Sequence, residues 1–397
     1  MSHNSVTTTI HGTQFGTSTD HVVFGRPAAD VIVEQVEASG KQRVLITTSK
    51  SLAGPDDLPA QIGRRLGSRF AGVFSAIGAH APRSSVLAGA AAAREAGADL
   101  LVSVGGGSVS DATKHMLLCL WENITDIDGF DPHLKNLAGM VDPSIRPADA
   151  ADRIRMMAVP TLLSAGEFTW FAGITDERRS VKEVAFHTLF SPTTVVLDPA
   201  ATLATPIPLL QSSGMKAVEH AVGFLCESDS IPLVEVVSAK AWSLLYDAIP
   251  KLGGPEDNPA LRLNLLLGAW YSIYSVNYGL HAGASHAIGH VLGALGVPHG
   301  DTGSSVVPGV LRWNADHNAD RQELAAASVG QSGRPLPDIL QEFARSMDRP
   351  TRLREVGIER HQFREIAEKS LHDPLIDYNS RPITSADDVM EILDLAW

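Results

Sequence analysis

The pattern of hydrophobic and polar positions changes character near Pro199. Before it, short apolar runs of the kind that form buried parallel strands alternate with amphipathic, helix-like segments. This alternation predicts an open parallel sheet wrapped by helices. The expected strands span residues 43–48, 71–74, 100–104, 155–160 and 194–197, and the expected helices span 28–39, 58–66, 84–96 and 110–121.

Beyond Pro199 helical periods dominate, and no strand pattern recurs. We therefore predict an α/β domain over residues 1–199 and an all-helical domain over 200–397, with a ligand cleft between them. Residues 5–25 are expected to form a short hairpin or edge strands, and residues 122–153 a surface loop. The expected C-terminal helices span 212–227, 233–248, 259–296, 306–315, 336–346, 361–370 and 386–397.

Composition is consistent with a globular protein of two domains. The chain has 397 residues, more than one typical core holds, with 44% hydrophobic and 19% charged residues. A net charge of −13 argues against nucleic acid or an anionic membrane as a partner, so an anionic substrate needs a local cationic pocket.

The cellular location is expected to be the cytoplasm. Two cysteines, Cys119 and Cys226, cannot form a disulfide framework, which favours a reducing compartment. The N-terminal stretch has no pattern of an export signal, and no apolar run reaches the roughly 20 residues of a membrane span.

A glycine-rich turn follows the strand expected at residues 100–104. Gly105, Gly106, Gly107 and Ser108 lead directly into a helix, so bare backbone N–H groups and the helix dipole would face an anion. A nucleotide pyrophosphate is the expected ligand, although a tight turn without a ligand explains the glycines equally well. The turn matches neither G-x-G-x-x-G nor the Walker A pattern.

Histidines gather in the stretch from Leu280 to His299. On a continuous helix His286 and His290 share one face, and a loop past the helix end could return His299 to the same point. Such a set suits metal binding or proton transfer. His281 lies off that face, and for it we expect the ordinary role of a hydrogen-bonded core histidine.

A second pair, Lys216 and His220, has the same four-residue spacing upstream. Two helices that offer paired polar groups to one cleft would complete a site. For Lys216 the alternative is a solvated lysine on a helix surface.

Five motifs together resemble one family, the iron-containing (group III) alcohol dehydrogenases, which have a dehydroquinate synthase-like fold. Within it the chain is most similar to the maleylacetate reductase branch, on the stretch SAGEFTWFAGITDERRSVKE, the Ser-His-x-x-Gly-His pattern and the ending RPITSADDVMEILDLAW. The five motifs are GGGSVSDATK at 105–114, VPTLLSAGEFT at 159–169, VVLDP at 195–199, SGMKAVEHAV at 213–222 and SHAIGHVLGALGVPHG at 285–300.

The resemblance implies NAD or NADP between an α/β and a helical domain. It places the pyrophosphate at Gly105, Gly106, Gly107 and Ser108. The nicotinamide and ribose side falls to Asp111, Thr161, Leu162 and Ser164, with Lys182 close to the cofactor. The family's metal ligands are an Asp, a His four residues later and two further histidines, and these positions hold Lys216, His220, His286 and His299. His290 matches the histidine that relays protons beside the metal.

Lys216 departs from the family pattern where it matters most. A protonated lysine cannot coordinate a divalent cation and repels one nearby. His220, His286 and His299 alone could still hold zinc or iron with an open position. We expect no metal, with Lys216 supplying the positive charge that holds a substrate carboxylate or a developing enolate.

The resemblance therefore implies an NAD(P)H-dependent reductase of a carboxylate-bearing unsaturated keto acid, of the maleylacetate to 3-oxoadipate type in aromatic-compound catabolism. His290 or a neighbour would supply the proton. Lys216, His220, His286, His290 and His299 are the candidate catalytic residues. The alternatives are a metal-dependent (iron or zinc) alcohol or aldehyde dehydrogenase of the same fold, a dehydroquinate synthase-like lyase that uses NAD transiently, and a non-catalytic nucleotide-binding protein.

Coenzyme choice depends on Ser49. The family tends to place an Asp here that rejects a 2′-phosphate, and this chain has Ser49 followed by Lys50. NADPH is therefore expected to be accepted alongside NADH, unless the loop turns away from the ribose. The helical domains of this family often associate, so a homodimer is expected. The place of Arg178 and Arg179, at the cleft or on the surface, is left open.

Overall fold

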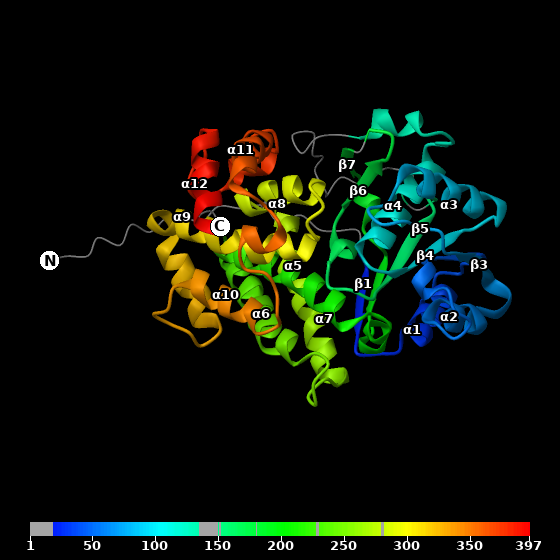
Figure 1. The fold of residues 1–397 in the computed structure, drawn as a ribbon. Coiled ribbons are helices and arrows are strands. Elements are labelled where there is room, and N and C mark those ends of the chain that lie inside the picture. The colour runs from blue at the N-terminus through cyan, green and yellow to red at the C-terminus, as the bar shows by residue number, and fades with distance from the viewer. Residues whose placement is uncertain (1–18, 135–149, 151, 180, 228–229, 279–281) are drawn as a thin grey trace.

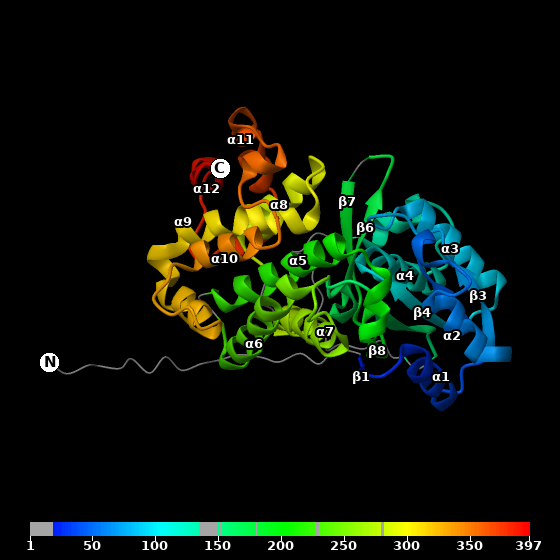
Figure 2. The same cartoon turned by 60° about the horizontal axis from the view of Figure 1, so that its bottom comes forward.

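The computed structural model describes residues 19–134, 150, 152–179, 181–227, 230–278 and 282–397. An N-terminal domain with an open sheet lies beside a C-terminal domain of helices, as Figures 1 and 2 show from two directions. This confirms the predicted fold class. The division at 199/200 stays a prediction: the last strand of the open sheet ends at Leu197 and the next long helix begins at Ile207.

The sheet has six parallel strands in the order β1-β8-β5-β4-β2-β3. The five strands predicted with bounds, which are all but β1, are present within two residues of their expected ends. The strands of the sheet are β1 (His21–Phe24), β2 (Val44–Thr47), β3 (Phe70–Phe74), β4 (Leu100–Gly105), β5 (Arg155–Pro160) and β8 (Thr194–Leu197). Of the segment expected to form a hairpin over 5–25, residues 1–18 lie outside the described chain, and β1 is an edge strand paired with β8.

Alternating residues of the strands bury into two separate cores, which is why each strand is apolar throughout. Val44 and Ile46 of β2 pack with one core, whereas Leu45 between them packs with the other. Both faces are covered by helices, so no polar face is needed. The helices are α1 (Ala28–Ala38), α2 (Leu58–Leu66), α3 (Arg83–Glu95) and α4 (Gly107–Trp121).

The strand order reverses between β2 and β4. The chain continues from β2 to β3 on one side and from β4 to β5 on the other. In an open parallel sheet the crevice at the carboxyl ends of such strands is where ligands bind. Ser49 follows β2 and the glycine turn follows β4, so both lie at this switch point.

A two-stranded antiparallel hairpin, β6 (Phe171–Asp176) and β7 (Val181–Phe186), was absent from the sequence prediction. In both strands Ala, Gly, Asp, Lys or Glu interrupt the Phe, Ile, Thr and Val residues that favour strands, so the strand pattern is broken. Arg178 and Arg179 at its end pair with buried Asp176 and with neighbouring carboxylates, so they serve this ion-pair network.

The C-terminal domain is helical, but the continuous helix expected over 259–296 is wrong. The structure divides it into α7 and α8, with a 3₁₀ segment at Tyr274–Tyr278, and residues 279–281, including His281, lie outside the described chain. The helices are α5 (Ile207–Leu225), α6 (Pro232–Ala248), α7 (Pro259–Ile273), α8 (Ala284–Ala294), α9 (His299–Ser328), α10 (Leu336–Arg345), α11 (Phe363–Ser370) and α12 (Ala386–Ala396).

His299 is not on a returning loop but is the first residue of α9. The short helix expected at 306–315 is part of this longer helix. Gly296 has a left-handed φ of +91° just after α8, and Pro298 leads into the new helix. The short connection sets α9 directly after α8. Within the described residues, no helix has the length and apolar character needed to cross a membrane.

The loop expected over 122–153 is described only in part. A 3₁₀ turn at Asp128–His133 buries Phe130 beside His115, so this part is anchored to the N-terminal core and is not wholly a surface loop. Residues 135–149 and 151 lie outside the described chain.

Asp198 joins the last strand of the sheet to the first helix. Its carboxylate accepts from the backbone N–H of Ala28, which is buried at the start of α1 (2.7 Å), and from that of Ala200 (2.9 Å). We expect Asp198→Ala to lower the free energy of unfolding by about 1–3 kcal/mol, because the Ala28 N–H loses its acceptor. Calorimetry should show a lower Tm, with Asp198→Asn less affected because one acceptor oxygen remains; an unchanged Tm for Asp198→Ala would contradict this role.

Candidate active site

The glycine turn and the loop after β5 pack against each other at the carboxyl edge of the sheet. The Thr161 N–H donates to the Gly105 carbonyl (3.1 Å). A side chain on Gly106 would meet Leu162 at 2.4 Å, and one on Gly107 would lie 3.0 Å from Ser164 Oγ. Only glycine permits this approach, so the structure brings the predicted cofactor residues of the two loops together.

An unpaired hydroxyl lies at this turn. Ser164 Oγ is buried and has no hydrogen-bond partner among the described residues. It lies beside Gly107, the first residue of the 15-residue helix α4, whose N-terminal N–H groups favour an anion. A buried donor next to a helix N-terminus fits a pyrophosphate. Ser108 Oγ, in contrast, accepts the His80 N–H (3.0 Å).

Ser49 lies at the same edge, on the strand next to β4. The preceding Thr48 donates its hydroxyl to the Val104 carbonyl (2.8 Å), which holds the end of β2 against the glycine turn. Ser49 is half-buried, and its hydroxyl contacts that of the exposed Ser51 at 2.9 Å. Its position is compatible with the predicted contact to a ribose.

The side chains of Asp111 and Lys182 both lie next to Gly173 of the hairpin. A Cβ built on Gly173 would lie 2.8 Å from Lys182 Cε and 3.4 Å from Asp111 Oδ2, so the lysine crosses the space that glycine leaves. Burial raises the pKa of Asp111, and Lys114 and Lys182 oppose that shift. Lys182 also lowers the pKa of Lys216 from the opposite domain, a smaller effect than that of burial. The two predicted lysines therefore lie within electrostatic reach of each other.

The histidines and Lys216 meet where α5 and α8 face each other. The rings of His220 and His286 stack with centroids 5.1 Å apart, and His290 lies one turn further along α8, 6.3 Å from His286. Lys216 is buried, with 9% of its side chain exposed, so it is not a solvated surface lysine. The structure thus brings predicted residues of both helices together, and their role in one site stays a prediction.

Glu219, which the sequence analysis did not single out, connects these groups. Its carboxylate lies 3.0 Å from Lys216 Nζ and 2.8 Å from His286 Nδ1, and it accepts a hydrogen bond from Ser285 Oγ at 2.9 Å. The sequence held a signal for it: a lysine in an otherwise apolar helix needs a counter-charge, and Glu219 is three residues away.

Asp373 is the second residue that sequence analysis missed. Its Oδ2 lies 2.7 Å from His290 Nδ1, while its Oδ1 accepts the Leu375 N–H at 3.0 Å. Burial raises the pKa of Asp373, but the hydrogen bond and charge of His290 outweigh this and lower it. The two residues are 83 positions apart, so no local pattern could pair them.

The charges of the site follow from its burial. Burial lowers the pKa of His286 to about 4 and that of His220 well below its ordinary value, so both imidazoles are neutral near pH 7. Burial raises the pKa of Glu219, but His286 and Lys216 outweigh it and hold the pKa well below the ordinary value. Burial also lowers the pKa of Lys216, and the charge and hydrogen bond of Glu219 oppose that shift and favour an ammonium beside the carboxylate.

The residue at the position of the family's first metal ligand does not fit the metal that the resemblance implies. The Lys216 ammonium has no lone pair to donate, and it is paired with Glu219 at the place of the expected carboxylate ligand. Across the described side chains, which exclude that of His299, no group of three His, Cys, Asp or Glu is arranged to hold a metal ion.

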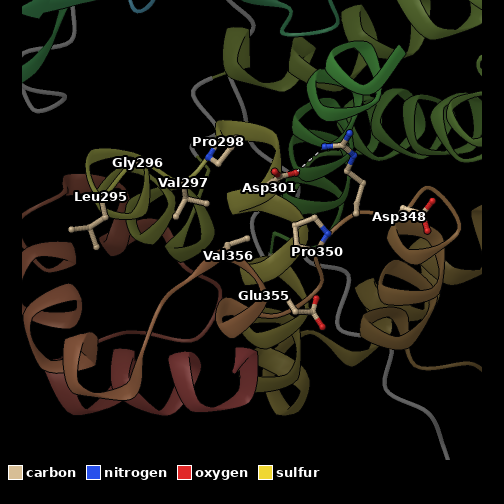
Figure 3. A pocket seen from close by; sticks show the side chains of 10 residues that line it. Leu295, Gly296, Val297, Pro298, Asp301, Asp348, Pro350, Glu355 and Val356 are labelled. Atoms are coloured by element: carbon tan, nitrogen blue, oxygen red, sulfur yellow. Dashed lines mark hydrogen bonds and ion pairs between the residues drawn. The ribbon is translucent and has the colours of Figure 1, made fainter. Parts of the chain in front are cut away.

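A separate pocket of about 740 Å³ lies at the junction of α8 and α9 (Figure 3). It contains an Arg349–Asp301 ion pair of 3.3 Å. Of the predicted site residues whose side chains the structure describes, none lines it.

Two family models match the chain. That of the iron-containing alcohol dehydrogenases matches residues 19–199, and that of the C-terminal part of the Fe-containing alcohol dehydrogenase family matches residues 211–397. The chain belongs to the iron-containing alcohol dehydrogenase family. It is thus a member of a family of oxidoreductases, and within it the chain is most like the maleylacetate reductase branch.

Individual relatives cover nearly the whole chain. Dehydrogenase ALT3 of Alternaria alternata is 28% identical over 89% of this chain and 98% of its own. Maleylacetate reductase 1 of Cupriavidus pinatubonensis is 26% identical over 94% of this chain and 93% of its own. The structure of sulfoacetaldehyde reductase from Bifidobacterium kashiwanohense in complex with NAD⁺ matches with a TM-score of 0.83 at 20% identity, covering 96% of this chain and 97% of that chain.

Gly303 on α9 leaves the space that Glu219 occupies. A Cβ at this position would lie 2.8 Å from Glu219 Oε2, whereas a Cβ at Gly293 on α8 would meet nothing within 4 Å. We expect Gly303→Ala to lower the free energy of unfolding by about 1–3 kcal/mol through overpacking. The matched variant Gly293→Ala should raise it by about 0.5–1 kcal/mol. Thermal melting of the two proteins checks this pair, and equal stabilisation by both would contradict the close packing over Glu219.

Proposed function

We propose that this protein is an NAD(P)H-dependent reductase of a carboxylate-bearing unsaturated keto acid, of the maleylacetate to 3-oxoadipate type, and that it works without a metal. The observation that carries the proposal is the buried Lys216–Glu219 pair at the position of the family's first metal ligand. The likeness to maleylacetate reductases supports the choice of substrate class.

The dinucleotide would be held at the carboxyl edge of the sheet. The backbone from Gly105 to Ser108 and the unpaired hydroxyl of Ser164 would take the pyrophosphate, with Thr161 and Leu162 behind it. Asp111 and Lys182 would lie toward the nicotinamide and ribose. The complex of sulfoacetaldehyde reductase with NAD⁺, which has the same fold, supports this choice of cofactor. When bound, the reduced nicotinamide supplies a hydride.

The helical side would stabilise negative charge and deliver a proton. An alkene conjugated with a carbonyl and a carboxylate carries its own electron sink, so a fixed cation can replace a Lewis acid. Lys216 would supply that cation, with the neutral imidazoles of His220 and His286 beside it. His290, oriented through Nδ1 by Asp373, has a side chain 41% exposed and would donate the proton at Nε2.

A metal-dependent alcohol or aldehyde dehydrogenase is the second candidate. His220 Nδ1 is buried without a hydrogen-bond partner among the described residues, and His220 and His286 stack closely, which suits two imidazole ligands. His299 would be the third ligand. A homodimer and a cytoplasmic location stay predictions for either candidate.

The two candidates differ in their response to metal removal. We expect chelator-treated protein to oxidise NADH or NADPH with maleylacetate and to contain much less than one metal ion per chain. Lys216→Met should lower kcat/KM by at least about tenfold, because the cation acts on developing charge. Aldehyde reduction that appears only on adding zinc or iron, with no turnover of maleylacetate, would replace this proposal with the second candidate.

Ser49 is expected to set the tolerance for NADPH. In Ser49→Asp a carboxylate would repel the 2′-phosphate, so kcat/KM for NADPH should fall at least about tenfold relative to that for NADH. The matched variant Ser51→Asp, two residues further along the same turn, serves as the control. An unchanged coenzyme ratio in Ser49→Asp would mean that this residue does not face the ribose.

A further inference from the structure

We propose that Glu219 is a positioning residue of this site, whose carboxylate fixes both the Lys216 ammonium and the tautomer of His286. The kinetic consequence of this role rests on the proposed function, whereas the geometric consequence does not. Glu219 belongs to neither the predicted cofactor residues nor the predicted catalytic residues.

The carboxylate of Glu219 is surrounded by donors from two helices. Glu219 is 3% exposed. Its Oε2 contacts Lys216, and its Oε1 contacts Ser285 and His286. An ionised carboxylate only accepts hydrogen bonds, so Lys216 donates from Nζ and Ser285 donates from Oγ. His286 Nδ1 lies 2.8 Å from Oε1 without hydrogen-bond alignment. A lone pair on Nδ1 would be repelled by the carboxylate at this distance, so the hydrogen of the ring is expected on Nδ1.

For His286 this arrangement fixes the tautomer. A neutral imidazole with its hydrogen on Nδ1 leaves the lone pair on Nε2, at the other side of the ring from Glu219. His286 therefore presents an acceptor to the site. Carboxylates orient histidine ligands in metal enzymes in the same way, and here a carboxylate does so with an ammonium as its second partner.

For Lys216 the contact limits a long, flexible side chain. A buried lysine has several rotamers, and its Nζ needs a fixed partner to hold one of them. Glu219 Oε2 lies one helical turn away at 3.0 Å, and the absence of a side chain at Gly303 allows Oε2 to stay there. The ammonium is thus held beside the two imidazoles.

The tautomer can be measured without any assay of activity. Long-range ¹H–¹⁵N spectra of the full-length protein, with ¹⁵N-labelled histidine, distinguish hydrogen on Nδ1 from hydrogen on Nε2, and His286→Asn assigns the resonances. We expect wild-type His286 to carry hydrogen on Nδ1, and Glu219→Ala to shift it toward Nε2. Hydrogen on Nε2 in the wild type would overturn the proposal, even if Glu219→Ala does not fold.

Kinetics test the second half of the role. Glu219→Gln keeps the shape but removes the charge, and we expect kcat/KM with NADH and maleylacetate to fall about 10–100-fold, mainly through kcat. Glu219→Asp should recover part of the loss. The control is Glu365→Gln, which removes the exposed lysine–glutamate pair that Glu365 makes with Lys369 on α11 and should leave activity unchanged.

The outcomes separate the two proposals. A loss in Glu219→Gln no larger than that in the control would overturn the positioning role, since a carboxylate with only a structural function would not affect turnover. Absence of maleylacetate turnover in the wild type would instead overturn the proposed function, and the tautomer of His286 would still decide the role of Glu219.

Discussion

The burial of one positive charge is the constraint on which the candidate site depends. An unpaired ammonium inside a helical domain costs several kcal/mol, and removing one partner of a buried pair is strongly destabilising. Glu219 offsets this cost for Lys216, and its other oxygen accepts a hydrogen bond from Ser285 and lies 2.8 Å from His286 Nδ1. Helix α9 packs against both α5 and α8, and the glycine at position 303 of α9 leaves space for Glu219 in this group of polar side chains.

In the N-terminal domain, the close approach of two loops depends on glycine residues. Two loops that follow neighbouring parallel strands must lie close enough to share a ligand, and glycines at 106 and 107 allow their backbones to approach Leu162 and Ser164. Lys182 reaches the same region across Gly173. On the sheet, glycines thus allow the groups of the site to lie close together. On the helices, charge pairing holds them in place.

The elements that sequence predicted well are those whose pattern is local. The buried strands are continuous apolar runs because both faces of the sheet are covered, and the ends of β5 and β8 match the expected ones. The continuous helix over 259–296 failed because apolar, small residues suit one buried helix as well as two. The hairpin β6–β7 was not predicted because small and charged residues interrupt the strand-forming residues of both strands, which pair with each other and lie against α4.

The sequence alone determined the fold class, the glycine turn, and the spacing of Lys216 with His220 and of His286 with His290, since each is written within a few residues. Only the tertiary structure decided which of these groups meet and with which partners. Asp373 reaches His290 across 83 positions, and Glu219 gains its role because α8 brings Ser285 and His286 to it. Spacing along a helix fixes which side chains share a face, but the electrostatic state of a buried group depends on what the rest of the chain packs against that face.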